Sequence, residues 1–297
     1  MTWRTSICGS LPALVTPMQS NGRVDHGALR ALVDWHVEQG TAGLVAVGTT
    51  GESATLDVTE HMAVVTAVVH QAAGRIPIIA GTGANATAEA IVLTRAAQDV
   101  GADAALLVTP YYNKPPQAGL RAHYAAIAEA CDLPQILYNV PSRTGCDLLP
   151  ETVAQLLEFP HIVGVKEAKG ELDRIQQLLD LGKGLVVLSG DDGTACESIL
   201  LGARGDISVT ANVAPAAMQA MCAAALEGDA ERARSLDAPL QGLHQELFCM
   251  PSPIPVKWAL QQMGRIPAGI RLPLVELESE FHPRVSGAMR QAHIELP

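Results

Sequence analysis

The chain has 297 residues, of which 48% are hydrophobic and 17% charged, with a formal net charge of -11 at pH 7. This length and apolar content supply one large core and exclude a mainly disordered chain. The acidic balance, without a basic cluster, argues against nucleic acid and against an anionic membrane surface as partners.

Four further patterns point to a cytoplasmic protein without a metal. No apolar run approaches the roughly 20 residues that cross a bilayer, and residues 1–6 lack the apolar stretch of a signal peptide, so we expect an unprocessed start. The six cysteines include no C-x-x-C pair, which predicts neither structural zinc nor disulfides and fits a reducing cytoplasm. The nine histidines show no metal-ligand spacing.

Short apolar runs, each ending in small, polar or proline residues, alternate with stretches of helical periodicity. The runs cover residues 11–17, 43–48, 76–83, 104–110, 134–141, 162–168, 185–192 and 205–212. Two of the helical stretches between them end in Gly40 and Gly74, residues that favour a helix C-terminus. Eight such units predict an α/β fold of the (β/α)8 or TIM-barrel type. An open doubly wound sheet is the alternative, but no G-x-G-x-x-G follows a strand.

The character of the sequence changes after residue 212. From Pro215 onward it is rich in Ala, Leu and Glu at helical spacing, without further strand runs. We therefore predict a TIM-barrel catalytic domain over residues 1–225 and a C-terminal helical domain over residues 226–297. The proline-bearing stretch 250–255 is predicted to be a turn between helices.

Lys166 is the one lysine of five that lies within an apolar strand run. Catalytic residues of this fold project from the C-terminal ends of the strands. Strand alternation places Gly164, Lys166 and Ala168 on one face, where the small neighbours leave space for a ligand if that face points inward. Burial favours the neutral amine, the form that adds to a carbonyl. The pattern favours an imine-forming lysine over a strand-end lysine paired with a carboxylate.

Candidate partners for Lys166 follow neighbouring strands. Tyr138, on the preceding strand, is either a proton shuttle for a carbinolamine or a core tyrosine. The GTTGES turn offers backbone N–H groups and the hydroxyls of Thr49 and Thr50 to a carboxylate, although such turns close many barrel strands. Arg143 is either a bidentate carboxylate clamp or an exposed loop arginine.

Three other polar features have simpler interpretations. The adjacent Tyr111 and Tyr112 point opposite ways if their loop is extended, so they either have different roles or both pack the loop. Asp191 and Asp192 lack a third metal ligand and indicate a turn. His61 is interpreted as a surface residue of the helix that follows the GTTGES turn.

Seven segments, in order along nearly the whole chain, carry a more specific signal. They are GTTGESATL at 48–56, TPYYNKP at 109–115, YNVPSRTG at 138–145, GVKEA at 164–168, SGDD at 189–192, SVTAN at 208–212 and SPIPVKWA at 252–259. With these segments the chain resembles the dihydrodipicolinate synthase family of pyruvate-dependent aldolases.

The resemblance implies a lyase that joins pyruvate to L-aspartate 4-semialdehyde through a Schiff base on Lys166. The product would be 4-hydroxy-tetrahydrodipicolinate, made in the first committed step of the diaminopimelate route to lysine, and no cofactor beyond the covalent imine is implied. The remaining roles also follow from the resemblance. A proton relay would comprise Tyr138, Thr49 and a Tyr112 that reaches into a neighbouring subunit, and substrate contacts would come from Thr50 (pyruvate carboxylate), Arg143 (semialdehyde carboxylate), Gly190 and Ile207.

The resemblance further implies a homotetramer, built as a dimer of dimers, with a site for the inhibitor L-lysine at the dimer interface. The matching positions are Ser53, Ala54, His61, Asn85, Glu89 and Tyr111. Val58 departs from the pattern, because lysine-inhibited members often carry a polar residue there, commonly histidine. Loss of a hydrogen-bonding group from a ligand site costs about 1–3 kcal/mol. We therefore expect weak or absent inhibition by L-lysine.

Two other functions compete with this one. Relatives that act on N-acetylneuraminate or on 2-keto-3-deoxy sugar acids share the barrel and the lysine, but commonly lack an arginine at the position of Arg143. A non-catalytic binding barrel is the third alternative. The presence of Lys166, Tyr138, Thr49 and Tyr112 counts against it.

Overall fold

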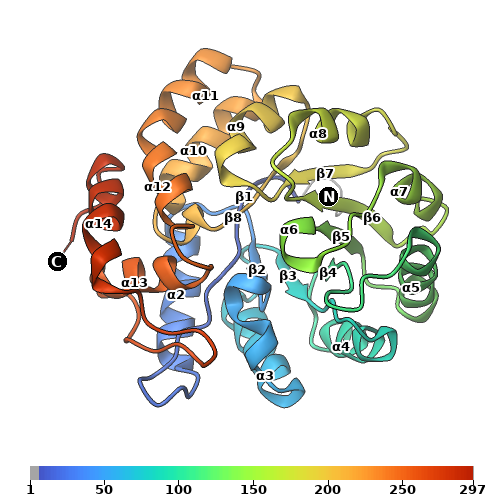
Figure 1. Ribbon diagram of the computed structural model, residues 1–297, viewed down its shortest axis with the longest axis horizontal. Helices are drawn as coiled ribbons and strands as arrows, with labels where there is room; N and C mark the ends of the chain where they lie inside the picture. The colour runs from blue at the N-terminus through green and yellow to red at the C-terminus, as the bar shows by residue number, and fades with distance from the viewer. Residues whose placement is uncertain (1–6, 297) are drawn as a thin grey trace.

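The computed structural model describes residues 7–296, so the predicted unprocessed start at residues 1–6 lies outside the described part, as does Pro297. Its centre is a ring of parallel strands surrounded by helices (Figure 1). The strands are β1 Gly9–Pro12, β2 Leu44–Ala46, β3 Ile78–Gly81, β4 Ala104–Val108, β5 Gln135–Asn139, β6 Ile162–Glu167, β7 Val186–Ser189 and β8 Gly205–Ser208. They lie in the order β1-β8-β7-β6-β5-β4-β3-β2.

The ring is closed where the first strand ends. Pro12 is the last residue of β1 that pairs with β8. Ala13 then forms an isolated parallel bridge with Val45, and the Leu14 N–H donates to the Val45 carbonyl at 3.0 Å. The first strand therefore begins before the predicted run at residue 11 and changes partner within it. The predicted (β/α)8 barrel is confirmed.

Helices fill the intervals between strands. Around the barrel they are α2 His26–Glu38, α3 Val58–Ala72, α4 Thr87–Asp99, α5 Gln117–Ala130, α6 Pro141–Thr144, α7 Pro150–Leu156, α8 Leu172–Leu179, α9 Asp192–Leu201 and α10 Pro215–Leu226. Local sequence explains their ends. The side chains of Asp25 and Asp57 accept backbone N–H groups at the starts of α2 and α3. Gly40 and Gly74 follow the ends of these helices at φ +76° and +72°.

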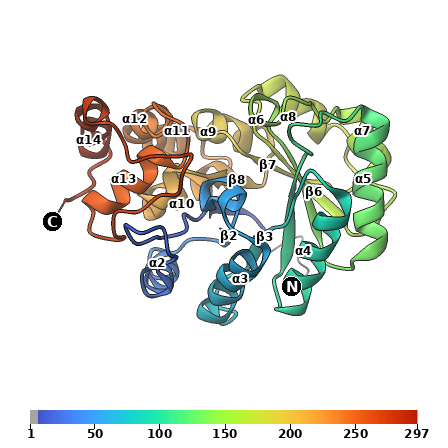
Figure 2. The ribbon, with the colours of Figure 1, turned by 60° about the horizontal axis from the view of Figure 1, so that its bottom comes forward.

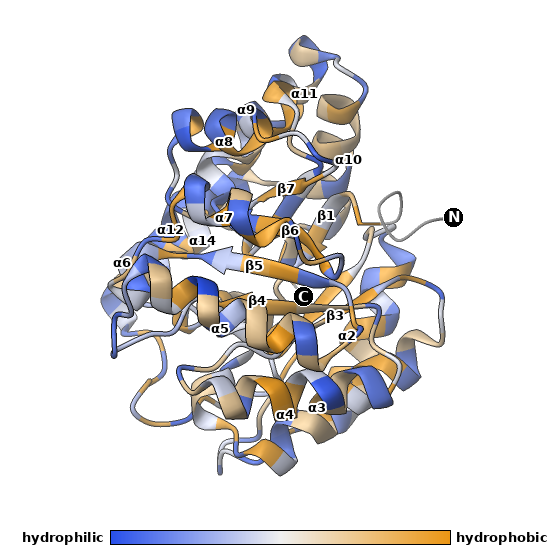
Figure 3. Cartoon of the chain, turned by 90° about the vertical axis from the view of Figure 1, so that its right-hand side faces the viewer, coloured by the Kyte–Doolittle hydropathy of each residue, from blue (hydrophilic) through white to orange (hydrophobic). Residues whose placement is uncertain are grey.

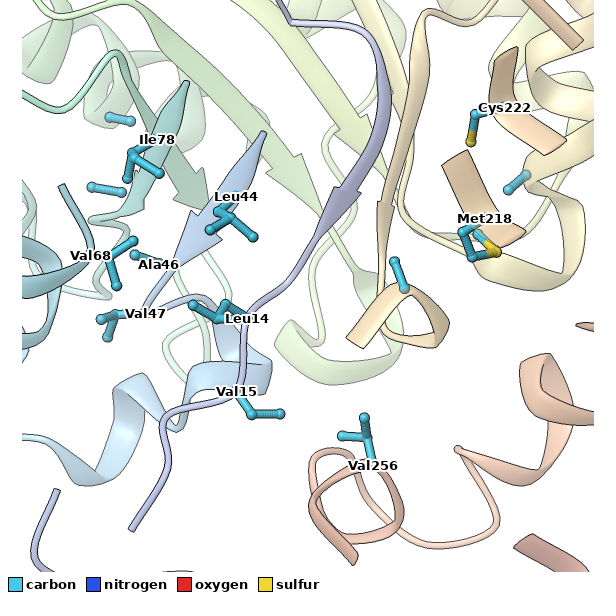
Figure 4. Packing of buried hydrophobic residues seen from close by; sticks show 14 of the residues in the cluster. Leu14, Val15, Leu44, Ala46, Val47, Val68, Ile78, Met218, Cys222 and Val256 are labelled. Atoms are coloured by element: carbon cyan, nitrogen blue, oxygen red, sulfur yellow. The ribbon is translucent and has the colours of Figure 1, made fainter. Parts of the chain in front are cut away.

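Strand alternation divides the apolar residues into two cores. Ile136, Tyr138 and Val140 point into the barrel interior. Leu137, from the same strand, packs outward in the larger core beneath the helices. Figure 4 shows part of this outer layer, and Figure 3 shows the hydrophilic residues on the outer faces of the helices. Inward and outward positions along one strand therefore face different surroundings.

The C-terminal helices lie against one side of the barrel (Figure 2). They are α11 Ala230–Asp237, α12 Gln241–Glu246, α13 Ile254–Gln262 and α14 His282–Gln291. Their residues Leu243, Val256 and Leu260 belong to the same outer core as the barrel helices. The predicted turn between helices ends at Pro253, since α13 begins at Ile254. The domain boundary near residue 225 stays a prediction and coincides with the end of α10. Over residues 7–296, no helix is long and apolar enough to span a membrane.

His36 provides a test of this packing through pH. It is fully buried on α2, and burial lowers its pKa to about 3. The unfolded chain therefore takes up a proton that the folded chain does not, and stability falls as pH drops below about 6.5. The free energy of unfolding of the wild type falls between pH 7 and pH 5. In His36→Leu this fall should be smaller by about 2 kcal/mol. Urea denaturation at both pH values measures it. The control is His70→Leu, at an exposed helix position, and an unchanged pH dependence in His36→Leu would contradict the prediction.

Candidate active site

A cavity of about 550 Å³ opens at the C-terminal ends of the strands. This is the end of a barrel at which catalytic groups gather. Six of the eight residues predicted for catalysis and substrate binding line it, namely Thr49, Thr50, Tyr138, Arg143, Lys166 and Gly190. Apolar residues of the barrel interior, such as Val45 and Leu106, form the rest of its floor.

Lys166 and Tyr138 form the centre of the site. They are register partners on β6 and β5, and the ammonium nitrogen Nζ lies 4.3 Å from the centroid of the Tyr138 ring. Both are buried, with 6% and 7% of their surfaces exposed. Gly190, at the end of β7, makes room for the lysine, because a Cβ there would lie 2.5 Å from Lys166 Cε. The inward orientation predicted for Lys166 is therefore observed.

The GTTGES turn bends sharply across the cavity. Val47 and Glu52, on either side of it, adopt left-handed φ angles of +55° and +58°. Such a conformation is strained for a β-branched residue, and strain of this kind concentrates at functional sites. Between them, the short 3-10 helix η1 Thr49–Gly51 begins at the cavity, which both threonines line. Free N–H groups at such a turn suit an anion.

Arg143 lies on the one-turn helix α6, whose first residue is Pro141 and which ends before Gly145 at φ +73°. Its guanidinium lines the cavity, and Nη2 donates to the Ser252 carbonyl at 3.5 Å. This contact leaves donors of the fork free for a carboxylate.

One wall of the cavity was not predicted. Residues 248–252, in the connection between α12 and α13, line it opposite the barrel strands. The sequence predicts a turn over residues 250–255 and no cavity wall at 248–252, because no charged side chain marks these residues. The signal that could have found it is the SPIPVKWA match, which begins at Ser252.

Tyr112 and Ile207 lie outside the cavity of this chain. Tyr112 stands in the loop after β4 with φ +72° and 90% of its surface exposed. Neighbouring Tyr111 is 37% exposed; the left-handed backbone at Tyr112 shows that the loop is not extended here, so the separate roles of the two tyrosines stay a prediction. Ile207 is buried within the barrel interior, and a backbone role for it in substrate binding stays a prediction.

Comparison with known proteins agrees with this geometry. The model of the dihydrodipicolinate synthetase family matches residues 6–292. The 4-hydroxy-tetrahydrodipicolinate synthase of Alcanivorax borkumensis is 62% identical, over 96% of this chain and 97% of its own length. The chain belongs to the dihydrodipicolinate synthetase family. The predicted resemblance is therefore confirmed.

Solved structures of the family have the same fold. One of them is the chloride-inhibited dihydrodipicolinate synthase of Acinetobacter baumannii, complexed with pyruvate. It is 56% identical and superposes with a TM-score of 0.96, and the match covers 97% of this chain and 100% of that chain. The family member from Cyanidioschyzon merolae, solved with lysine bound, is 36% identical with a TM-score of 0.94, covering 98% of this chain and 99% of its own.

A second, smaller cavity of about 40 Å³ lies between α3 and α4. Four of the six residues predicted for a lysine site line it, together with Val58; they are Ser53, His61, Glu89 and Tyr111. Ala54 and Asn85 are not among its lining residues.

His61 corrects one expectation about this region. Its predicted surface position is wrong, since the side chain is buried and its Nε2 lies 2.8 Å from the Gly81 carbonyl. Burial lowers the pKa of this imidazole, while the contact with the carbonyl partly opposes the shift. The hydrogen bond to the end of β3 offsets the free-energy cost of burying a polar ring.

The Asp191–Asp192 pair begins α9 rather than a metal site. Asp191 accepts a hydrogen bond from the Thr194 hydroxyl at 2.8 Å. Asp192 is buried and accepts the backbone N–H groups of Val209 and Thr210, at 3.1 and 2.9 Å. The two carboxylates therefore fix the start of a helix and the segment after β8; the predicted turn is wrong for Asp192, which is the first residue of α9.

A buried ion pair fastens the GTTGES turn to the C-terminal helices. Lys257 on α13 donates to a carboxylate oxygen of Glu52, and the other oxygen accepts the Arg271 N–H at 3.1 Å. Arg271 in turn forms a bidentate pair with Glu60, with both distances 2.7 Å. Burial lowers the pKa of Lys257, and the Glu52 charge opposes that shift. The GTTGES turn is therefore held from outside the barrel.

This ion pair predicts a large stability effect. Lys257→Met should lower the free energy of unfolding by about 3–5 kcal/mol, because it leaves the Glu52 carboxylate buried without its partner. The double variant Glu52→Gln/Lys257→Met should recover much of the loss. Urea denaturation measures both. The control is Lys169→Met, which breaks a more exposed pair with Glu171 and should cost less than about 1 kcal/mol. Equal losses in the two single variants would contradict the prediction.

Proposed function

We propose that the chain is a 4-hydroxy-tetrahydrodipicolinate synthase, a lyase that condenses pyruvate with L-aspartate 4-semialdehyde. The observation that carries this proposal is the Lys166 amine, buried against Tyr138 at the base of a cavity that also holds Arg143. Relatives that bear this name match the chain along almost all of its length. The related Acinetobacter structure holds pyruvate.

The chemistry begins with the neutral Lys166 amine, which adds to the ketone carbon of pyruvate. The resulting carbinolamine loses water to give an imine, and loss of a methyl proton gives the enamine. The Tyr138 hydroxyl, on the adjacent strand, is placed to pass protons at these steps. Thr49 and Thr50 hold the pyruvate carboxylate against the turn. The covalent imine serves in place of a separate cofactor.

The acceptor is selected at the mouth of the cavity. The enamine carbon attacks the aldehyde of L-aspartate 4-semialdehyde, and the adduct cyclises with one water lost overall. Arg143 clamps the carboxylate of the semialdehyde with its free guanidinium donors. A sugar-acid aldolase would have to seat a long polyhydroxylated chain here. The arginine and the apolar wall of Phe248 and Met250 favour the shorter acid.

The proton relay requires a second subunit. Tyr112 projects into solvent in this chain, so we propose that it completes the relay of Tyr138 and Thr49 in a neighbouring copy. A homotetramer built from two tight dimers provides such an arrangement. We place the enzyme in the cytoplasm, because its six cysteines include no C-x-x-C pair and fit a reducing compartment.

L-Lysine is proposed as a weak inhibitor at the small cavity of Ser53, His61, Glu89 and Tyr111. The lysine-bound relative supports an allosteric site in this family. Glu89 supplies a negative charge for an ammonium group, and Tyr111 a hydroxyl. Val58, which lines the same cavity, supplies no hydrogen bond. Ala54 and Asn85 would contribute once a second subunit covers the site.

Trapping the imine tests the proposed function directly. Borohydride reduction in the presence of pyruvate should inactivate the enzyme and label Lys166, as mapped by mass spectrometry of the peptides. Lys166→Ala should take up no label, whereas Lys169→Ala, three residues further on, should be labelled like the wild type. L-Aspartate 4-semialdehyde should be turned over and N-acetylneuraminate should not. Label that persists in Lys166→Ala would refute the proposal.

Val58 gives a separate prediction for inhibition. The concentration of L-lysine that gives half-maximal inhibition of the wild type should lie above the submillimolar range. Val58→His adds a hydrogen-bonding group to the cavity and should lower that concentration about tenfold. Val92→His, at an exposed valine of α4, is the control and should change nothing. Submillimolar inhibition of the wild type would contradict the prediction.

A further inference from the structure

The residues that follow Tyr138 and Lys166 point the opposite way. Asn139 and Glu167 are also register partners, one step further along β5 and β6. Because successive strand residues alternate, their side chains lie on the helix side of the barrel wall. The Asn139 amide donates to both Glu167 carboxylate oxygens, at 2.9 and 3.2 Å. The two strands that carry the reacting pair are thus joined behind it by side chains as well as by the sheet.

The same asparagine closes the loop that carries Arg143. Its amide also donates to Asp147 Oδ1 at 2.8 Å, and its carbonyl oxygen accepts the Leu148 N–H at 2.9 Å. The loop leaves β5 at Asn139 and returns to the same side chain eight or nine residues later. Arg143 lies midway between these two ends.

Arg174 on α8 completes the cluster. Its guanidinium grips Asp147 with two bonds of 2.8 Å and lies 3.6 Å from a Glu167 oxygen. The side chains of Arg174 and Glu167 are 8% and 1% exposed. Arg174 holds the pKa of Asp147 below its usual range, so this carboxylate stays charged near neutral pH. All four side chains have hydrogen-bond partners, which makes the network rigid rather than strained.

The network cannot act on a substrate directly, but it can position groups that do. None of Asn139, Asp147, Glu167 and Arg174 lines the cavity. Within residues 7–296, the Arg143 guanidinium makes one side-chain hydrogen bond, the long one to the Ser252 carbonyl. Its place relative to Lys166 is therefore set by the backbone of its loop. A shift of about 1 Å in such a group costs on the order of 100-fold in rate.

We propose that Asn139, Asp147, Glu167 and Arg174 are positioning residues that fix the loop of Arg143 against the strand pair of Lys166 and Tyr138, and so determine recognition of the acceptor carboxylate. The inference rests on the proposed function, because it assigns the acceptor to Arg143. It extends that function to groups behind the barrel wall that touch neither substrate.

The test separates the two substrates. Arg174→Met should raise the KM for L-aspartate 4-semialdehyde about 10- to 100-fold, with the rate of borohydride-trapped imine formation from pyruvate changed less than about threefold. Arg174→Lys keeps the charge but loses the bidentate geometry, so it should show a smaller increase in KM. Asp147→Asn, at a partly exposed side chain, should reproduce the effect of Arg174→Met if that variant folds poorly.

A double-mutant cycle shows whether the effect passes through Arg143. In an Arg143→Ala background, Arg174→Met should raise the acceptor KM less than about threefold, because the group it positions is gone. The matched control is Arg234→Met, which removes a bidentate pair with Glu197 far along the chain on α11. This variant should leave both kinetic parameters unchanged.

The outcomes distinguish this inference from the proposed function. A full increase in KM within the Arg143→Ala background, or an equal loss of imine formation, would overturn the positioning role and leave a merely structural network. Absence of pyruvate label on wild-type Lys166 would overturn the proposed function, and this inference with it, before any variant is compared. Non-additive effects on the acceptor with intact imine formation support the proposal.

Discussion

The pairing of β5 with β6 is the constraint on which the rest of the site depends. Tyr138 pairs with Lys166 and Asn139 with Glu167 in a single register. The first pair therefore points a phenol and an amine into the cavity. The second pair points an amide and a carboxylate into the layer beneath the helices. A slip of one residue would exchange the two faces and bury charges without partners. Chemistry and anchoring are fixed by the same backbone pairing.

The barrel alone does not complete the site. Its interior supplies Lys166, Tyr138 and an apolar floor, but the wall opposite comes from residues 248–252. The turn of Thr49 and Thr50 likewise depends on Lys257, which pairs with Glu52 from α13. The C-terminal part of the chain therefore supplies one wall of the cavity and supports the turn that lines another part of it. This explains why its apolar residues continue the barrel's outer core without a break.

The sequence predicted the parts of this arrangement that are local. Alternating apolar runs gave the strands, and a rare lysine inside one of them marked an amine that lines the cavity. Position after the strands also indicated Thr50 and Arg143, and the resemblance added Gly190; all three line the cavity. Pairings between distant segments were missed, because periodicity describes one element at a time. Lys257 was visible only as part of a matching segment, and Asn139 and Glu167 only as neighbours of the residues of interest. His61 was misplaced because its partner, the Gly81 carbonyl, is a backbone group that no side-chain pattern reveals.

Paired strands hold some parts of the site rigidly, whereas connections between elements hold others and can vary, and this difference bears on specificity in the family. Lys166 is held by strand pairing and by the absence of a side chain at Gly190, so under the proposed function any change there should disturb imine formation with every substrate. Arg143 and residues 248–252 lie on connections between elements, and such segments accept substitution and insertion more readily than paired strands. In the proposed function, the reaction with the keto acid is thereby separated physically from the choice of aldehyde. A barrel built this way can acquire a different acceptor by changing two loops, provided that the network behind β5 and β6 still ties the first of them to the lysine.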